Sequence, residues 1–433
     1  MLQFGTDGVR GDADTQLTSD FVVALARAFV QATGALRVLL ARDPRESGPR
    51  IEAALAAGFA VEGVACESAG VLPTPGLAVV SRQRDEWAAM ISASHNRWSD
   101  NGIKFFAPGG TKLSDEHQSA IEALLPTIPS GVNQQQIVLP VDASPVYADW
   151  LCEQVGGGSL GGLRVVLDCA NGAASTIAPA VFERLGANVT TIHAAPDGRN
   201  INEGCGSTHL ASLQAAVVDE HADLGLAFDG DADRVLEVDE RGDVVDGDQI
   251  MAIMGIAMRE RGELTNDAIA ITVMSNLGLR RALAEHGIGF VKTPVGDRHV
   301  VAAMERDDLA LGGEQSGHII FGHRSRTGDG TLTGLLLAAR AAETSRPLSE
   351  LAAVMTRLPQ VLVNVRVGGR VDLTSGAVAA AIAGVEGELG DDGRVLVRPS
   401  GTEPLVRVMV EAPTTQRAEV AAQRIIAAIE STP

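Results

Sequence analysis

The chain of 433 residues is poor in cysteine, in aromatic side chains, in long apolar runs and in net positive charge. Its four cysteines, Cys66, Cys152, Cys169 and Cys205, are scattered and lack the close spacing of metal-binding motifs. Few cysteines in a large chain are typical of a reducing compartment. No stretch approaches the roughly 20 apolar residues of a membrane span, and the N-terminus has neither a basic start nor an apolar run. We therefore expect a soluble cytoplasmic protein.

The charge balance excludes a second set of functions. A formal net charge of −20 argues against broad binding to nucleic acid or to an anionic membrane. If the substrate is itself anionic, the site needs its own cluster of Arg and Lys. Aromatic residues make up only 3% of the chain, so Ala, Gly and Val do much of the filling, as suits tightly packed α/β layers.

The length predicts several domains, because one core stops growing at about 250–300 residues. Strands and helices alternate along most of the chain, which predicts three α/β-layered domains with mixed sheets. In the last part, strands at 361–367, 394–397 and 405–410 and helices at 371–382 and 416–429 predict a smaller α+β domain with an antiparallel sheet. We expect boundaries that give domains 1–143, 144–246, 247–357 and 358–433.

A polar loop follows the apolar strand-like run Trp87 to Ile91. It offers a hydroxyl (Ser94), an imidazole (His95) and an ammonium (Lys104) within a dozen residues. A serine hydroxyl is a poor nucleophile unless a neighbour activates it or its oxygen already carries a phosphoryl group. A lone Ser-His pair is more often a simple turn, so the interpretation depends on the other polar loops.

The strongest single motif is Asp229-Gly230-Asp231-Ala232-Asp233-Arg234, at the carboxyl end of the expected strand 224–228. Ligands gather at this end of strands in α/β sheets. Three carboxylates close together repel one another without a cation, and hard cations such as Mg²⁺ prefer oxygen ligands. The alternatives are a solvated acidic turn and a helix-loop-helix calcium loop, which wants a later Glu and flanking helices. Arg234 could hold a phosphate oxygen beside the metal.

Three further loops carry candidate site residues. Glu314, Ser316 and His318 alternate between glycines, and in an extended loop all three would point the same way, toward sugar hydroxyls; a decorated glycine-rich turn is the alternative. Near the C-terminus, a phosphate cradle is predicted from Arg398, Ser400, Gly401, Thr402 and Arg407, with an ordinary strand-connecting turn as the alternative. Arg10, in the glycine-rich segment 4–11, is a candidate active-site cation; no strand leads into that segment, so it is not a dinucleotide loop.

Taken together and in this order, the five loops resemble those of the α-D-phosphohexomutase family, and the match spans the whole chain. Segments 4–11, 272–279, 295–298 and 314–318 resemble most closely the branch that acts on glucosamine phosphates. Arg97-Trp98 departs from the pattern, because similar proteins usually have proline at the first position. Without the proline, φ is free and an N–H donor is added, so we expect a more mobile serine loop.

The resemblance implies four domains around one deep cleft and an isomerase that transfers a phosphoryl group through a phosphorylated Ser94. It implies one Mg²⁺ per site, held by the Ser94 phosphate with Asp229, Asp231 and Asp233, and a hexose 1,6-bisphosphate as activator. Arg10, Lys104, Arg234 and His318 would surround the transferring group. Glu314, Ser316 and His318 would bind the sugar, and the phosphate that is not reacting would lie on Arg398, Ser400, Gly401, Thr402 and Arg407.

Several alternatives stay open at this point. The general base is Lys104 or His318, and the residues do not choose between them. The substrate implied by the resemblance is a hexosamine phosphate, with a phosphoglucomutase or phosphomannomutase as the second enzyme hypothesis. A sugar-phosphate-binding protein without turnover is a third, disfavoured by the retention of Ser94 and the three Asp residues. Whether the chain is a monomer or a homodimer is undecided.

Overall fold

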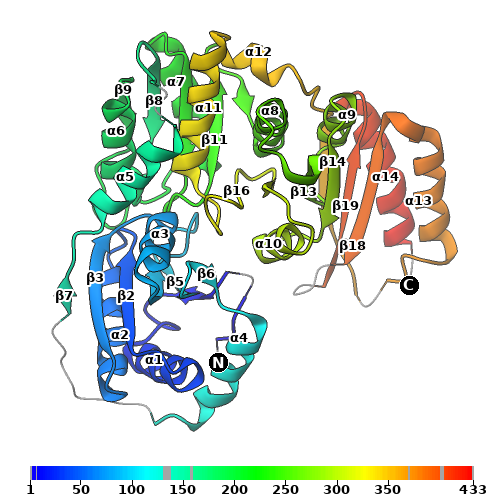
Figure 1. Cartoon of the computed structure of the whole chain (residues 1–433). Helices are drawn as coiled ribbons and strands as arrows, with labels where there is room; N and C mark the ends of the chain where they lie inside the picture. Colours follow the sequence, from blue (N-terminus) through cyan, green and yellow to red (C-terminus); the bar gives the residue numbers. More distant parts are fainter. Residues whose placement is uncertain are drawn as a thin grey trace. The chain divides into compact units, whose positions relative to one another are not determined.

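A computed structural model of the chain describes residues 2–5, 7–129, 138–156, 159–368, 371–399 and 404–431. The chain divides into two compact units (Figure 1). The larger unit consists of residues 1–274 and 288–353, and the smaller one of residues 275–287 and 354–433.

The first sheet of the larger unit is mixed and has the order β1-β5-β4-β2-β3-β7, with β6 paired to β5. The pairs β4–β2, β2–β3 and β3–β7 are parallel. Strand β5 is antiparallel to β1, β4 and β6. The strand bounds are Val9–Asp12 (β1), Arg37–Arg42 (β2), Ala65–Val71 (β3), Trp87–Ile91 (β4), Asp100–Ala107 (β5), Thr111–Lys112 (β6) and Leu139–Pro140 (β7).

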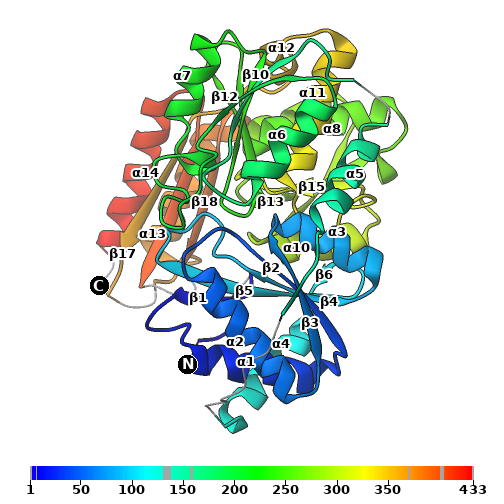
Figure 2. The same cartoon turned by 90° about the vertical axis from the view of Figure 1, so that its left-hand side faces the viewer.

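Four helices cover this sheet: α1 (Ser19–Thr33), α2 (Gly48–Val61), α3 (Thr74–Arg84) and α4 (Asp115–Leu124). Helices α1, α2 and α4 lie on one face and α3 on the other (Figure 2). The Thr18 side chain caps the N-terminus of α1, and Gly34, with φ 67°, ends it. The apolar face of α1 packs with α2 over alternate residues of β2, such as Val38 and Leu40.

The second sheet has the order β12-β11-β10-β8-β9, with β8, β9 and β10 parallel and β10, β11 and β12 antiparallel. Helix α7 (Ala211–Asp219) packs on one face, where Leu213 and Val217 meet strand residues. The other helices of this layer are α5 (Ser144–Gln154), α6 (Ala174–Arg184) and α11 (Gly330–Thr344). The strands are Arg164–Asp168 (β8), Asn188–Ile192 (β9), Leu224–Phe228 (β10), Val235–Asp239 (β11) and Val244–Val245 (β12).

The third sheet has the order β14-β13-β15-β16, and only β16 is antiparallel to its neighbour. Helix α8 (Gly247–Glu260) begins with a capping box formed by Asp246 and Gln249. Helix α10 (Asp297–Arg306) packs on β13 and β15, and α12 (Leu348–Ala352) packs on α8. The strands are Ala268–Thr272 (β13), Gly289–Thr293 (β14), Leu311–Gly313 (β15) and Ile319–Phe321 (β16).

The smaller unit is built on an antiparallel sheet of order β17-β19-β18. Its strands are Gln360–Arg366 (β17), Arg394–Pro399 (β18) and Leu405–Glu411 (β19), and its helices are α9 (Leu277–Glu285), α13 (Gly376–Leu389) and α14 (Thr415–Glu430). Helix α9 begins at Leu277, whose backbone N–H donates to the Glu411 carboxylate at 2.9 Å. Short 3-10 helices occur at Leu125–Thr127, Gly206–Thr208, Thr265–Asp267 and Gly390–Asp392.

This order of three mixed α/β layers and a final antiparallel α+β sheet confirms the predicted fold class. Two local predictions are wrong. The predicted helix 371–382 begins only at Gly376, because the Asp372 carboxylate accepts hydrogen bonds from Thr374 and Ser375 and holds a turn there. Lys104 lies in strand β5 rather than in the serine loop.

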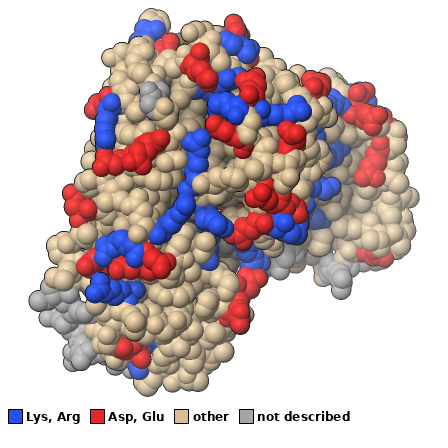
Figure 3. All heavy atoms as spheres, viewed as in Figure 1, with Lys and Arg blue, Asp and Glu red and all other residues tan. Residues whose placement is uncertain are grey.

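Charged side chains of both signs lie on the surface. On the face drawn in Figure 3, acidic and basic side chains lie side by side. Surface ion pairs of the chain include Arg184 with Asp149 and Arg306 with Asp307. In the described part of the chain, no helix combines the length and the apolar character needed to cross a membrane.

Candidate active site

Ser94 lies just beyond the carboxyl end of β4, in the larger unit. Its backbone has φ 53°, a left-handed conformation that is uncommon for residues other than glycine. The side chain is fully buried, and its Oγ donates to Asp229 Oδ2 at 2.5 Å. The structure therefore places the serine hydroxyl predicted from one loop directly on the acidic motif predicted from another.

The acidic motif follows β10, and its three carboxylates converge. Oxygens of Asp229, Asp231 and Asp233 lie within 4.8 Å of one another, and all three residues are buried. A strand precedes the motif and a hairpin follows it, so the helix-loop-helix alternative is wrong. Thr74, at the start of α3, donates through its Oγ1 to Asp231 at 2.5 Å, and sequence analysis gave no sign of this residue.

Two oxygens of this cluster have no hydrogen-bond donor. Asp231 Oδ1 and Asp233 Oδ1 are buried and lack a hydrogen-bond partner within the described residues. Buried acceptors that are left unsatisfied are costly, and a divalent cation is the ligand that converging carboxylates fit best. Burial and the charges of Asp233 and Asp231 raise the pKa of Asp229 well above its ordinary value, which also reflects uncompensated negative charge. The triad therefore offers the converging oxygen donors that a divalent cation needs.

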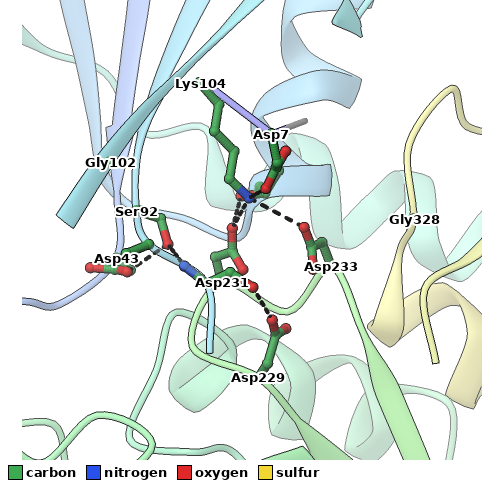
Figure 4. A network of polar contacts seen from close by, with 12 residues as sticks. Asp7, Asp43, Ser92, Gly102, Lys104, Asp229, Asp231, Asp233 and Gly328 are labelled. Atoms are coloured by element: carbon green, nitrogen blue, oxygen red, sulfur yellow. Dashed lines mark hydrogen bonds and ion pairs between the residues drawn. The ribbon is translucent and has the colours of Figure 1, made fainter. Parts of the chain in front are cut away.

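Lys104 reaches this cluster from β5 (Figure 4). Its Nζ lies 2.7 Å from Asp231, 2.8 Å from Asp7 and 3.2 Å from Asp233. Burial alone would lower the pKa of Lys104, but the carboxylates of Asp231, Asp7 and Asp233 raise it well above its ordinary value. Lys104 is thus a fixed ammonium in this arrangement.

The Asp7 carboxylate lies against three cations, of which only Arg10 belongs to the N-terminal segment 4–11. The carboxylate accepts from Arg10, Lys104 and Lys112, and Lys112 in turn bridges to Asp297 at the start of α10. Burial would raise the pKa of Asp7, but Lys104 and Lys112 lower it well below its ordinary value. Arg10 also approaches the carbonyl oxygen of Ala93 at 3.4 Å, so the predicted cation lies beside the serine loop. Sequence analysis assigned no role to Asp7, Lys112 or Asp297.

Arg234 and His95 meet on the other side of Ser94. The Arg234 guanidinium lies 3.1 Å from His95 Nδ1, which is itself 3.3 Å from Ser94 Oγ. Its Nε lies 3.8 Å from Asp233. Burial and the nearby charges of Arg234 and Arg10 lower the pKa of His95 to about 4, so its ring is neutral at pH 7. A neutral ring can accept the Arg234 N–H through Nδ1.

His318 lies at the start of β16, and its ring is buried between two carboxylates. Its Nδ1 is 3.7 Å from Asp233, and its Nε2 is 3.6 Å from Asp297 and accepts from the Gly328 N–H at 3.1 Å. A Cβ on residue 328 would lie 2.6 Å from the ring, so only glycine permits this approach. Burial would lower the pKa of His318, but Asp233 and Asp297 raise it.

The segment that carries Glu314 and Ser316 is a tight hairpin turn, which matches the alternative of a glycine-rich turn and not the extended loop. The Gly317 N–H donates to the Glu314 carbonyl, and the Glu314 N–H donates to the His318 carbonyl. The alternation argument therefore fails, since a turn does not orient every second side chain alike. Ser316 is exposed, and the Glu314 carboxylate accepts from the Gly296 N–H at 3.0 Å.

The predicted phosphate cradle belongs to the smaller unit. Arg398 on β18 and Arg407 on β19 are directly opposite each other, so their side chains share one face of the sheet. Burial and the neighbouring Arg407 charge lower the pKa of Arg398. Arg407 Nε is buried and has no hydrogen-bond partner among the described residues. Ser400, Gly401 and Thr402, the other members of the predicted cradle, lie outside the described residues.

Two further buried residues surround the serine loop, and sequence analysis missed both. Arg45 follows β2 and Asn202 follows β9, and each donates to the carbonyl oxygens of Ser94 and Asn96. Neither belongs to a recognisable motif. The only available signal was a charged residue, Arg45, next to an expected strand end.

Comparison with known proteins follows the same order of domains. Models of the phosphoglucomutase/phosphomannomutase alpha/beta/alpha domains I, II and III match residues 1–131, 147–242 and 246–358, and that of the C-terminal domain matches residues 362–428. A phosphoglucosamine mutase of Kineococcus radiotolerans is 51% identical over 445 residues, which cover 98% of this chain and 97% of that protein. A phosphoglucosamine mutase of Saccharopolyspora erythraea is 52% identical over 433 residues, covering 98% and 96%.

Solved structures agree on the fold. A phosphoglucomutase/phosphomannomutase family protein from Burkholderia thailandensis has a TM-score of 0.82 at 23% identity, over 99% of this chain and 98% of that one. At this identity the likeness shows the fold alone.

Proposed function

Because the chain belongs to the phosphoglucomutase/phosphomannomutase family, we propose that it is a phosphoglucosamine mutase, an isomerase that interconverts glucosamine 6-phosphate and glucosamine 1-phosphate. The choice of sugar is supported by relatives of about 50% identity over nearly the whole chain that bear this name. The observation that carries the chemistry is the buried Ser94 hydroxyl, which lies on Asp229 within a triad of carboxylates.

Ser94 is the phosphoryl carrier in this proposal. A phosphoryl group on its Oγ passes to the free hydroxyl of a hexosamine monophosphate: the P–O bond to Ser94 breaks, the bond to the sugar oxygen forms, and the hydroxyl proton passes to a base. The bisphosphorylated sugar then reverses its orientation in the site and returns its other phosphoryl group to Ser94. Because phosphoryl transfer depends mainly on positioning and charge neutralisation, Arg10, Lys104 and Arg234 are proposed to neutralise the group in transit.

The metal is proposed to be one Mg²⁺ per site, held by Asp229, Asp231, Asp233 and the Ser94 phosphate. Oxygen donors alone and a charge-rich pocket support a hard cation. When bound, such an ion neutralises phosphate charge. A hexose 1,6-bisphosphate is proposed as the activator, since it can transfer one phosphoryl group to Ser94 and leave as a hexose monophosphate.

For the general base, two observations favour His318 over Lys104. Lys104 is a poor base because three carboxylates hold it in the charged form. The His318 imidazole lies between Asp233 and Asp297, whose charges raise its pKa and so favour uptake of a proton. We therefore propose His318 over Lys104.

For the sugar, Glu314, Ser316 and His318 are proposed to bind hydroxyls. The phosphate that is not reacting is proposed to bind Arg398, Arg407 and the Ser400, Gly401 and Thr402 segment. The cross-strand pair Arg398 and Arg407 supports this, since two cations on one face of a sheet favour an anion between them.

The remaining expectations stand as proposals. They are the domain boundaries 1–143, 144–246, 247–357 and 358–433, a cytoplasmic location, and action on a small-molecule substrate without nucleic-acid or membrane partners. A homodimer stays an alternative to the monomer, and sedimentation of the purified protein distinguishes them.

The deciding experiment compares turnover of glucosamine, glucose and mannose 6-phosphates by the purified protein. A protonated amine at C2 needs an acceptor or anion beside it, and Glu314 is the anionic side chain of the proposed sugar segment. We expect kcat/KM to be higher for glucosamine 6-phosphate than for glucose 6-phosphate, by about tenfold or more. Glu314→Gln should lower kcat/KM for both sugar phosphates. It should also reduce the difference in kcat/KM between glucosamine 6-phosphate and glucose 6-phosphate. A wild-type preference for glucose or mannose phosphate would make the protein a phosphoglucomutase or phosphomannomutase instead.

A further inference from the structure

Arg45 is fully buried beside the serine loop, although it has no place among the groups assigned above. A guanidinium has five N–H donors in a fixed planar fork. Here they meet five acceptors, four of which are backbone carbonyls of a single loop. The acceptors are Asp43 Oδ2 (2.9 Å) for Nε, the carbonyls of Ser94 (2.8 Å) and Asn96 (2.9 Å) for Nη2, and those of Asp100 (3.0 Å) and Arg97 for Nη1.

Ser94 is held through both of its backbone groups. Its N–H donates to Ser92 Oγ at 2.9 Å, and Ser92 Oγ donates to Asp43 at 2.6 Å. Its carbonyl accepts from Arg45 and, at 2.9 Å, from Asn202 Nδ2. The same Asn202 amide donates to the Asn96 carbonyl at 3.0 Å. The Asp43 carboxylate thus joins the groups that hold both backbone groups of Ser94 (Figure 4 shows Asp43 and Ser92).

These contacts explain how a strained backbone persists at Ser94. A non-glycine residue at φ 53° is kept only when its surroundings over-determine the conformation. The Arg97 carbonyl is one of the acceptors, so the clamp also acts where related chains usually have proline. The expected extra mobility of the loop is therefore opposed by Arg45.

We propose that Arg45, with Asn202 as its second donor, is a positioning residue for phosphoryl transfer at Ser94. This inference rests on the proposed function. The Ser94 oxygen must occupy one place both when it gives up the phosphoryl group and when it takes the other one back. A displacement of about 1 Å can cost about a hundredfold in rate, whereas binding of the distal phosphate is not mediated by these contacts.

The first experiment measures the loop without using activity. Hydrogen–deuterium exchange of peptides covering 88–101 is compared in wild type, Arg45→Lys and Asn202→Gly; glycine keeps the positive φ of residue 202 (58°) while removing its amide. Arg50→Lys is the matched control, since Arg50 also donates to two backbone carbonyls, those of Ala13 and Leu17, neither of which belongs to the serine loop. We expect these peptides to exchange faster than in wild type in Arg45→Lys and Asn202→Gly, and at the wild-type rate in Arg50→Lys.

The second experiment separates kcat from KM for glucosamine 6-phosphate. Arg45→Lys should lower kcat by about ten- to a hundredfold, with KM within about twofold of wild type. Asn202→Gly should lower kcat by a smaller factor, and Arg50→Lys should leave both constants near wild type. The variants should also need more added hexose 1,6-bisphosphate for full activity, because a displaced Ser94 recaptures the phosphoryl group more slowly than the intermediate leaves.

Three results would overturn the proposal: a kcat for folded Arg45→Lys within about twofold of wild type, an equal loss in Arg50→Lys, or exchange in the loop unchanged from wild type. If Arg45→Lys does not fold, Asn202→Gly decides alone by the same criteria. Absence of turnover by wild type with all three sugar phosphates would instead refute the proposed function, and the exchange comparison would still decide whether Arg45 and Asn202 hold the loop.

Discussion

Replacing Lys104 with methionine tests the charge balance at the centre of the site. The Nζ of Lys104 lies 2.7–3.2 Å from three carboxylates, and its side chain is only 2% exposed. Removing one partner from a buried ion pair leaves an uncompensated charge and costs about 3–5 kcal/mol. We therefore expect Lys104→Met to lower the free energy of unfolding of the larger unit by about that amount at pH 7 without metal.

The stability difference between Lys104→Met and wild type should depend on pH. In wild type, Lys104 helps to hold the pKa values of Asp7 and Asp233 well below their ordinary range, so their stabilising effect is present at neutral pH and is lost only at low pH. Without Lys104, fewer cations oppose the effect of burial, so both pKa values should rise relative to wild type. The folded variant then binds protons more readily than folded wild type, so the variant should lose less stability than wild type as pH falls from 7 toward about 4. The difference from wild type should shrink over this range.

The assay is urea unfolding followed by tryptophan fluorescence. The three tryptophans, Trp87, Trp98 and Trp150, all lie in the larger unit, so the signal reports its unfolding. Lys292→Met is the matched control, because Lys292 on β14 is exposed. Added Mg²⁺ should restore part of the lost stability in Lys104→Met. A loss below about 1 kcal/mol, or a loss that does not change between pH 7 and pH 5, would refute the reasoning.

Three other substitutions test the separate parts of the site. Ser94→Ala should abolish turnover and the mass increase of one phosphoryl group expected in intact wild-type protein; near-normal turnover would rule out the phosphoserine mechanism. Asp231→Asn should weaken Mg²⁺ binding, measured by calorimetry, and lower the rate while the protein stays folded; equal wild-type activity with and without EDTA would remove the metal from the mechanism. Arg398→Ala should raise KM for the monophosphate by about ten- to a hundredfold, since a charge-assisted contact is worth about 1.5–3 kcal/mol; an unchanged KM would mean that the distal phosphate binds elsewhere.

Local patterns in the sequence were sufficient to predict the fold class and the two central loops. Alternating apolar runs such as Trp87 to Ile91 predict strands because their side chains must be buried. The Asp229 to Asp233 spacing predicts a metal site because three carboxylates so close in the chain repel one another unless a cation lies between them. These signals are contained in a few consecutive residues, and for that reason they survive without knowledge of the fold.

Long-range packing decided the rest. Lys104 was expected in a loop, but antiparallel pairing of β5 with β4 makes it a buried strand residue that points at carboxylates from another sheet. Helix α11, expected within domain 247–357, packs on the second sheet, where Gly334 approaches Leu226 so closely that a Cβ would overlap it. Such contacts join residues more than 100 positions apart, and no local pattern encodes them.

The environment of Ser94 shows the same division. The motif around Ser94 identified the serine, because its neighbours in the chain carry the signal. Arg45 and Asn202, which hold its carbonyl, lie 49 and 108 positions away and belong to no motif. Every residue carries the same backbone carbonyl, so the sequence does not indicate which residue donates a hydrogen bond to it. Only the tertiary structure could therefore decide which residues hold the serine in place.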